Sequence, residues 1–163
     1  MDGFVEHAEE AFGCGGLGPI VVVVWRGGPT AERMERCYAA FERAARRTSG
    51  PVGMLSVVEA GAPPPPLTLL PAIAREFDRQ TRMKATVLVL EDRGPMAIGL
   101  FEAASTLASL WKLRRPTKIC VDSREAITWL AQRVEGTPER DAVLALVERV
   151  RAALPAKAPS VVP

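Results

Sequence analysis

The sequence predicts an α/β fold in which a mixed, mostly parallel sheet is flanked by helices. The apolar run VLVL at 87–90 lacks helical spacing and is typical of a strand buried on both faces, and the β-branched run VVVV at 21–24 favours a sheet. Segments with apolar residues at spacings of three and four alternate with these runs, as they do in parallel sheets. Breaks rich in glycine and proline separate the segments, so each one is a distinct element.

The first strands are predicted to form an antiparallel hairpin. An extended segment from Phe4 to Phe12 is followed by GCGG at 13–16, and these glycines are expected to turn the chain. The hairpin would be completed by the β-branched strand from Ile20 to Trp25.

Two helices and a strand follow this hairpin. Thr30 is a suitable N-cap for a helix that runs to about Arg47, and the strand from Val52 to Val58 comes after it. Four prolines at 63–66 then form a stiff extended connection, most simply a loop, although such a run is also a ligand for proline-recognising domains. The next helix is expected over about 67–82.

The central strand is predicted within KATVLVLED at 84–92, and the remaining elements alternate after it. They are a helix from Met96 to Leu113, a short strand from Thr117 to Val121, a helix capped by Asp122 or Ser123, and a last helix from Pro138 to about Leu154. This makes residues 1–154 one domain with an extra C-terminal helix, and the proline-rich residues 155–163 a disordered tail.

Composition places the chain among soluble globular proteins. It is 48% hydrophobic and 25% charged, and its longest apolar run is too short to cross a bilayer, so no transmembrane segment is expected. The N-terminus lacks the pattern of a secretory signal, so a cytoplasmic location is expected. Cys37 and Cys120 lie on apolar faces and are interpreted as core residues rather than as a disulfide or metal site.

No pattern of catalytic residues is recognisable, so the chain is predicted not to be an enzyme and to use no cofactor or metal. His7 is the sole histidine, and the sequence contains no G-x-S-x-G motif of a serine hydrolase. The glycines at 13–18 lack the lysine and hydroxyl of a phosphate-binding loop. Glu91 and Asp92 at the end of the central strand leave one enzymatic alternative, because neighbouring carboxylates there can act as acid and base or bind magnesium.

A group of four cations is a possible contact for phosphate or lipid head groups. It consists of Lys112, Arg114, Arg115 and Lys118. The group has no interleaved aromatic residues and the net charge of the chain is only +2, so no specific nucleic-acid partner is predicted.

The helix from Met96 to Leu113 is apolar over more than half of its circumference and therefore needs a second covering surface. One possibility is a second subunit, which would make the protein a homo-oligomer such as a homodimer. The residues expected at that interface are Met96, Leu100, Leu107, Leu110 and Trp111. The alternative is that the same residues pack inside the monomer.

The order of these elements, and above all the closing segment KICVDSREAITWL at 118–130, resembles the SpoIIAA-like group of the STAS fold, the sulfate-transporter and anti-sigma-factor-antagonist domains. The resemblance covers about residues 4–134. It implies a STAS-like fold and a regulatory role through protein contacts. Relatives of that fold also bind small apolar or anionic ligands.

In phosphorylated members of that family, a serine or threonine near the start of the helix after the central strand is modified by a partner kinase. The corresponding stretch here, DRGPMAIGLF at 92–101, has no hydroxyl, and the nearest ones are Ser105 and Thr106. Regulation by phosphorylation would therefore have to use a shifted position.

Two functions are therefore expected. The first is a non-catalytic, STAS-like regulatory or scaffolding domain that contacts protein partners, or itself, through the helix from Met96 to Leu113. The alternative is a small-molecule or lipid-binding module with a pocket between the proline loop and the carboxyl end of the central strand.

Overall fold

A computed structural model describes residues 2–94, 97–111 and 115–156, without the side chain of Trp111. The strands are β1 Phe4–Ala8, β2 Phe12–Leu17, β3 Ile20–Trp25, β4 Val52–Val58, β5 Met83–Leu90 and β6 Thr117–Cys120. The helices are α1 Ala31–Ala45, α2 Leu70–Asp78 after a 3₁₀ turn at Leu67–Leu69, α3 Ala97–Trp111, α4 Ser123–Ala131 and α5 Arg140–Ala153. Within these ranges no helix has both the length and the apolar composition needed to span a bilayer.

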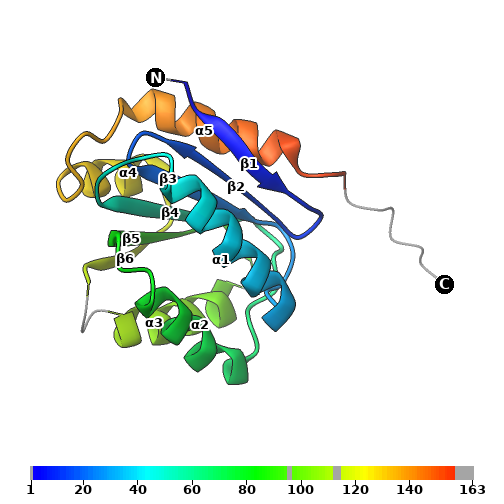
Figure 1. Cartoon of the computed structure of the whole chain (residues 1–163). Coiled ribbons are helices and arrows are strands. Elements are labelled where there is room, and N and C mark those ends of the chain that lie inside the picture. Colours follow the sequence, from blue (N-terminus) through cyan, green and yellow to red (C-terminus); the bar gives the residue numbers. More distant parts are fainter. Residues whose placement is uncertain (1, 95–96, 112–114, 157–163) are drawn as a thin grey trace.

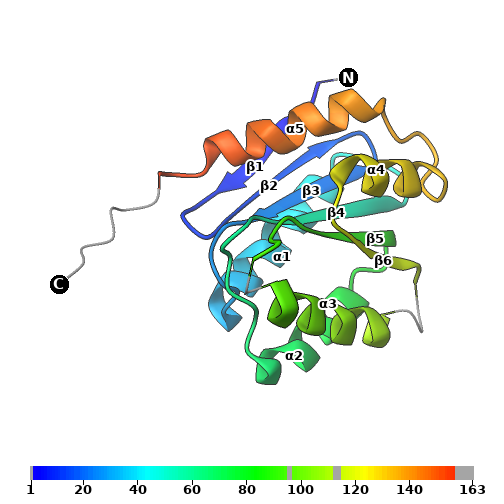
Figure 2. The ribbon, with the colours of Figure 1, turned by 180° about the vertical axis from the view of Figure 1, so that it is seen from behind.

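The strands form one mixed sheet in the order β1-β2-β3-β4-β5-β6 (Figure 1). The first three strands are antiparallel neighbours, and β3 to β6 are parallel. Crossovers of one hand between successive parallel strands place their helices on one face of the sheet. Accordingly, α1, α2 and α3 share a hydrophobic core on one face, while α4 and α5 cover the other (Figure 2). The α/β class and the mixed sheet predicted from the sequence are confirmed.

Alternation of side chains divides the central strands between these two cores. Met54 and Leu88 face α1 to α3, whereas Leu55, Val57 and Val87 face α4 and α5. The prediction that the run at 87–90 is buried on both faces is therefore confirmed, because one residue in two of an interior strand serves each helical layer.

The N-terminal hairpin was predicted with the wrong turn. The glycines at 13–16 do not turn the chain but lie within β2, and β1 to β3 form a three-stranded meander. The turn between β2 and β3 consists of Gly18 and Pro19, and Gly18 has a φ of +55°, a left-handed conformation that glycine adopts readily.

The glycines of β2 serve close packing instead. A Cβ atom on Gly15 would lie 2.5 Å from the carbonyl oxygen of Phe4 and 2.9 Å from a methyl group of Val150 on α5. A Cβ on Gly13 would lie 2.8 Å from another methyl group of Val150. The missing side chains therefore allow α5 to pack directly on the backbone of β2.

Helix boundaries largely follow the predicted caps. The Arg33 amide donates a hydrogen bond to Thr30 Oγ1 over 3.2 Å, and the Arg124 amide donates to Asp122 Oδ1 over 2.9 Å. The last helix begins at Arg140 rather than at the predicted Pro138, and just before it the Thr137 hydroxyl donates to the Val134 carbonyl over 2.7 Å. Similarly, α2 ends at Asp78 rather than near Arg82. The Arg82 guanidinium instead binds the carbonyls of Ala45 and Gly50 at and beyond the end of α1.

We expect Gly15→Ala to lower the free energy of unfolding by about 1–3 kcal/mol, because the new methyl group overlaps a backbone carbonyl that cannot rotate away. Gly50→Ala is the matched control, since a Cβ there would meet no atom within 4 Å. Chemical denaturation measured by circular dichroism compares the two. Equal stability of both variants would contradict the role assigned to the β2 glycines.

Candidate functional site

An apolar cavity of about 90 Å³ lies between the sheet and helices α1 to α3. Its floor is formed by two rows of residues near the carboxyl ends of the parallel strands. One row is Val23, Ser56 and Leu88, which are neighbours in the register of β3, β4 and β5, and the next is Trp25, Val58 and Leu90. The cavity therefore lies near the edge of the sheet where α/β proteins commonly bind ligands.

The walls of the cavity come from all three helices on this face. Met34 and Cys37 belong to α1, Ile73 and Phe77 to α2, and α3 contributes Leu100, Ala103, Ala104 and Leu107. None of the described lining residues is charged. Burial raises the pKa of the Cys37 thiol well above its usual value, so this group is neutral at physiological pH.

Residues 61–66, here called the proline strap, cover one side of the cavity, and Ala62, Pro63 and Pro65 line it. Pro63 packs against Gly28, where a Cβ atom would lie 2.8 Å from the proline ring. Pro64 approaches Gly99 on α3, where the corresponding distance is 3.6 Å. The strap thus bridges the β3–α1 loop and the first turn of α3.

Asp92 ties the proline strap to the loop after β5. Its Oδ2 accepts a hydrogen bond from the Gly61 amide over 3.0 Å, and its Oδ1 accepts one from the Gly94 amide over 2.7 Å. These two amides hold the pKa of Asp92 below its usual value, since they stabilise the charged carboxylate. The role of Asp92 seen in the structure is to position the strap.

Glu91 points to the opposite face of the sheet and belongs to a different group, the strand-end ion cluster of Arg26, Glu59, Glu91 and Arg151. Arg151 on α5 donates to both carboxylate oxygens of Glu91 over 2.7 and 3.0 Å, and to Glu59 over 3.2 Å. Arg26 donates to Glu59 over 2.8 Å. Two carboxylates and two guanidinium groups thus pair with one another and hold the end of α5 on the sheet.

The two carboxylates of the enzymatic alternative therefore serve different contacts and do not converge on one crevice. Each is occupied by hydrogen bonds from its own neighbours. In the described part of the chain, no group of three or more histidine, cysteine, aspartate or glutamate side chains is arranged to hold a metal ion.

The predicted interface residues of α3 do not share one exposed face. Leu100 and Leu107 are only 4% and 7% exposed and line the cavity, so they are unavailable to a partner, in contrast to the prediction. Leu110 is exposed. Met96 and the side chain of Trp111 lie outside the described residues. The error arose because helical spacing does not show which part of a wide apolar face is covered within the monomer.

The described hydroxyl and cationic residues that were predicted as sites make contacts within the protein itself. Thr106 lies on the outer side of α3, where its hydroxyl donates to the Glu102 carbonyl, and Ser105 is half-buried. Arg115 donates to the carbonyls of Gln80 and Met83, both over 3.1 Å, and Lys118 pairs with Glu125 at 2.5 Å. These two cations therefore bind the protein itself, and Lys112 and Arg114 lie outside the described residues.

Two residues of the cavity and two exposed residues of α3 are not among the site residues predicted from the sequence. Ser56 appeared as one residue of a core strand, and Cys37 as a small core residue. Ile98 and Phe101 are exposed on α3, although neither was among the interface residues predicted. The available signal for Ser56 was a single hydroxyl at an inward position of the run MLSVV.

We expect Asp92→Ala to lower the protection of the Gly61 amide against hydrogen exchange by on the order of tenfold, because its acceptor is removed. In the wild type the lowered pKa of Asp92 means that the contact is complete above about pH 4 and is lost as the carboxylate is protonated at lower pH. Exchange measured by NMR and corrected for the intrinsic rate at each pH tests both statements.

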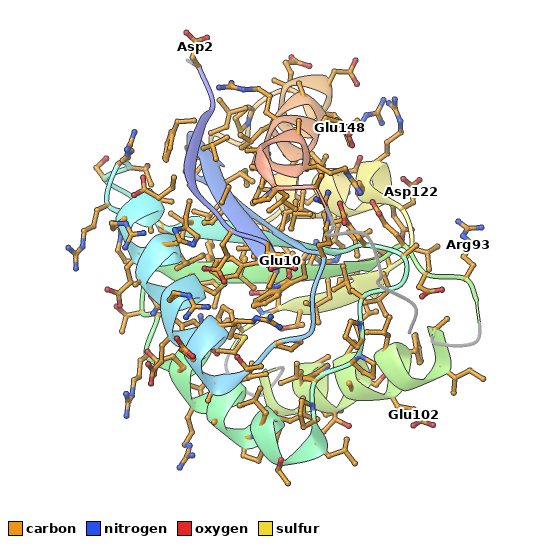
Figure 3. All side chains as sticks on the ribbon, turned by 90° about the vertical axis from the view of Figure 1, so that its right-hand side faces the viewer. Asp2, Glu10, Arg93, Glu102, Asp122 and Glu148 are labelled. Carbon is orange, nitrogen blue, oxygen red and sulfur yellow. The ribbon has the colours of Figure 1, made fainter. Side chains whose placement is uncertain are left out.

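Arg93→Ala is the control for this experiment, since Arg93 is exposed beside Asp92 and its side chain projects outward (Figure 3). Protection of Gly61 that is the same in all three proteins would show that the carboxylate does not hold the strap.

No family model, curated protein or solved structure matches this chain. The resemblance to STAS domains therefore stays a prediction from the residues quoted for it, and the function has to be argued from the cavity and the surfaces around it.

Proposed function

We propose that this protein is a non-catalytic binding domain that holds a small apolar molecule in the cavity under the proline strap. The observation that carries the proposal is the cavity's position, at the carboxyl ends of β3, β4 and β5 and bounded by a connecting loop. Ligand sites of open α/β sheets lie at that edge because the loops there vary without disturbing the core.

Packing energetics favours an occupant. Protein interiors are close-packed, and an unfilled apolar cavity destabilises the folded state by about 24 cal/mol per Å³, or about 2 kcal/mol for 90 Å³. A molecule that fills the space restores those contacts. Besides the strands of its floor, the cavity is lined by residues of α1, α2, α3 and the strap, so filling it also links these four segments.

The volume limits the size of that molecule. An apolar cavity of about 150 Å³ holds benzene, so 90 Å³ is suited to about three to five carbon atoms without rearrangement. A longer alkyl chain would have to displace the proline strap. The proposal therefore concerns a small molecule, or the end of a larger one that enters past the strap.

We expect Ala104→Leu to abolish binding with little loss of stability, because the larger side chain grows into existing space from the α3 wall. Thr106→Leu is the matched control on the outer side of the same helix. Xenon, which enters empty apolar cavities, should shift the amide resonances of Ala103 and Leu107 in the wild type and the control but not in Ala104→Leu. Absence of xenon shifts in the wild type would overturn the proposal.

A second candidate is a regulatory or scaffolding domain of STAS type that binds a protein through the outer side of α3. The observation that favours it is the exposure of Ile98 and Phe101, which are 70% and 58% exposed and lie one turn apart. These side chains replace Leu100 and Leu107 as the anchors of a contact, because the latter face the cavity. The partner proposed is a second copy of this chain.

If that contact forms, Phe101→Asp should shift the protein from dimer to monomer in size-exclusion chromatography with light scattering, because a charge at the contact has no partner. Glu102→Gln is the control, since Glu102 is exposed on α3 and points away from the sheet (Figure 3). A wild-type protein that remains monomeric at high concentration would exclude this candidate.

A further inference from the structure

Ser56 differs from the other buried polar residues of the described chain. Four such residues are buried, and three of them have partners. Gln80 donates to Glu42 over 3.3 Å, Thr86 to the sulfur of Met83 over 3.2 Å, and Thr117 to the Arg115 carbonyl over 3.3 Å. Ser56 is 4% exposed, and within the described residues its hydroxyl takes part in no hydrogen bond.

Folding alone does not account for a serine at this position. Its neighbours across the sheet are Val23 on β3 and Leu88 on β5, and the facing walls are apolar. A buried hydroxyl without a partner costs folding free energy, whereas alanine would avoid that cost. The one unusual feature of its surroundings is that Ser56 lines the cavity, which leaves room for a partner that is not part of the chain.

We propose that Ser56 is the polar anchor of the ligand site, and that the ligand is a small neutral molecule with one hydroxyl or carbonyl oxygen. This inference rests on the proposed function of the cavity and adds the chemical class of its occupant. The Ser56 hydroxyl can both donate and accept, so it pairs equally with an alcohol, an aldehyde or a ketone.

The residues that line the cavity also exclude charged ligands. No charged side chain among the described lining residues could compensate a carboxylate, phosphate or ammonium group, and burial of an uncompensated charge is strongly unfavourable. Among the described lining residues, the other side chains that can donate a hydrogen bond are Cys37, whose thiol is neutral and a weak donor, and Trp25. One polar atom on an otherwise apolar molecule therefore matches the site.

The test compares 1-butanol with n-pentane, which have equal numbers of non-hydrogen atoms, by titration of the wild type and Ser56→Ala. Amide shifts of residues that line the cavity report binding. We expect Ser56→Ala to weaken binding of 1-butanol about five- to tenfold, the loss of one hydrogen bond, and to leave n-pentane binding unchanged. Butanoate should not bind the wild type.

Ser109→Ala is the matched control, because Ser109 is exposed on α3 with its hydroxyl bound to the Ser105 carbonyl. It should leave both affinities unchanged, and thermal unfolding should show Ser56→Ala to be at least as stable as the wild type. Equal effects of Ser56→Ala on both probes, or none on either, would overturn the assignment of Ser56 while the binding function stands. Failure of both probes to bind the wild type would overturn the binding function itself.

Discussion

The register of three parallel strands is the constraint on which the rest of the structure depends. Trp25, Val58 and Leu90 are neighbours at the carboxyl ends of β3, β4 and β5. The pairing continues one residue further, because the amides of Glu59 and Glu91 donate to the carbonyls of Trp25 and Val58. Side chains of a strand alternate between the two faces of the sheet. The apolar row Trp25, Val58 and Leu90 therefore faces α1, α2 and α3, and the charged residues that follow them in sequence face α5.

The charged row and the apolar row differ in how completely they are packed. On the α5 face, the strand-end ion cluster is compact and internally neutral, and it is only partly exposed, so breaking one pair would leave a poorly solvated charge. On the other face, apolar side chains from three helices converge without filling the space between them. The edge of the sheet is thus rigid on one side and incompletely packed on the other, an arrangement suited to a binding site on a fixed scaffold.

Much of the fold follows from local sequence, and most of the site does not. The strand β3 is predicted by its β-branched run, and the starts of α1 and α4 by the caps Thr30 and Asp122. The glycines of β2 were misread because a close approach of α5, distant in sequence, has the same residue signature as a turn. Leu100 and Ile98 are both apolar on α3, and only the tertiary structure shows that one lines a cavity while the other faces solvent.

The direct packing of α5 on β2 bears on how the protein folds during synthesis. The Arg149 guanidinium on α5 donates a hydrogen bond to the carbonyl of Gly3, 146 positions earlier, and Val150 contacts the glycine strand. Until α5 leaves the ribosome, the apolar face of the nascent N-terminal meander has no cover. Such non-local closure slows folding, and it leaves this apolar face open to aggregation until α5 packs on it.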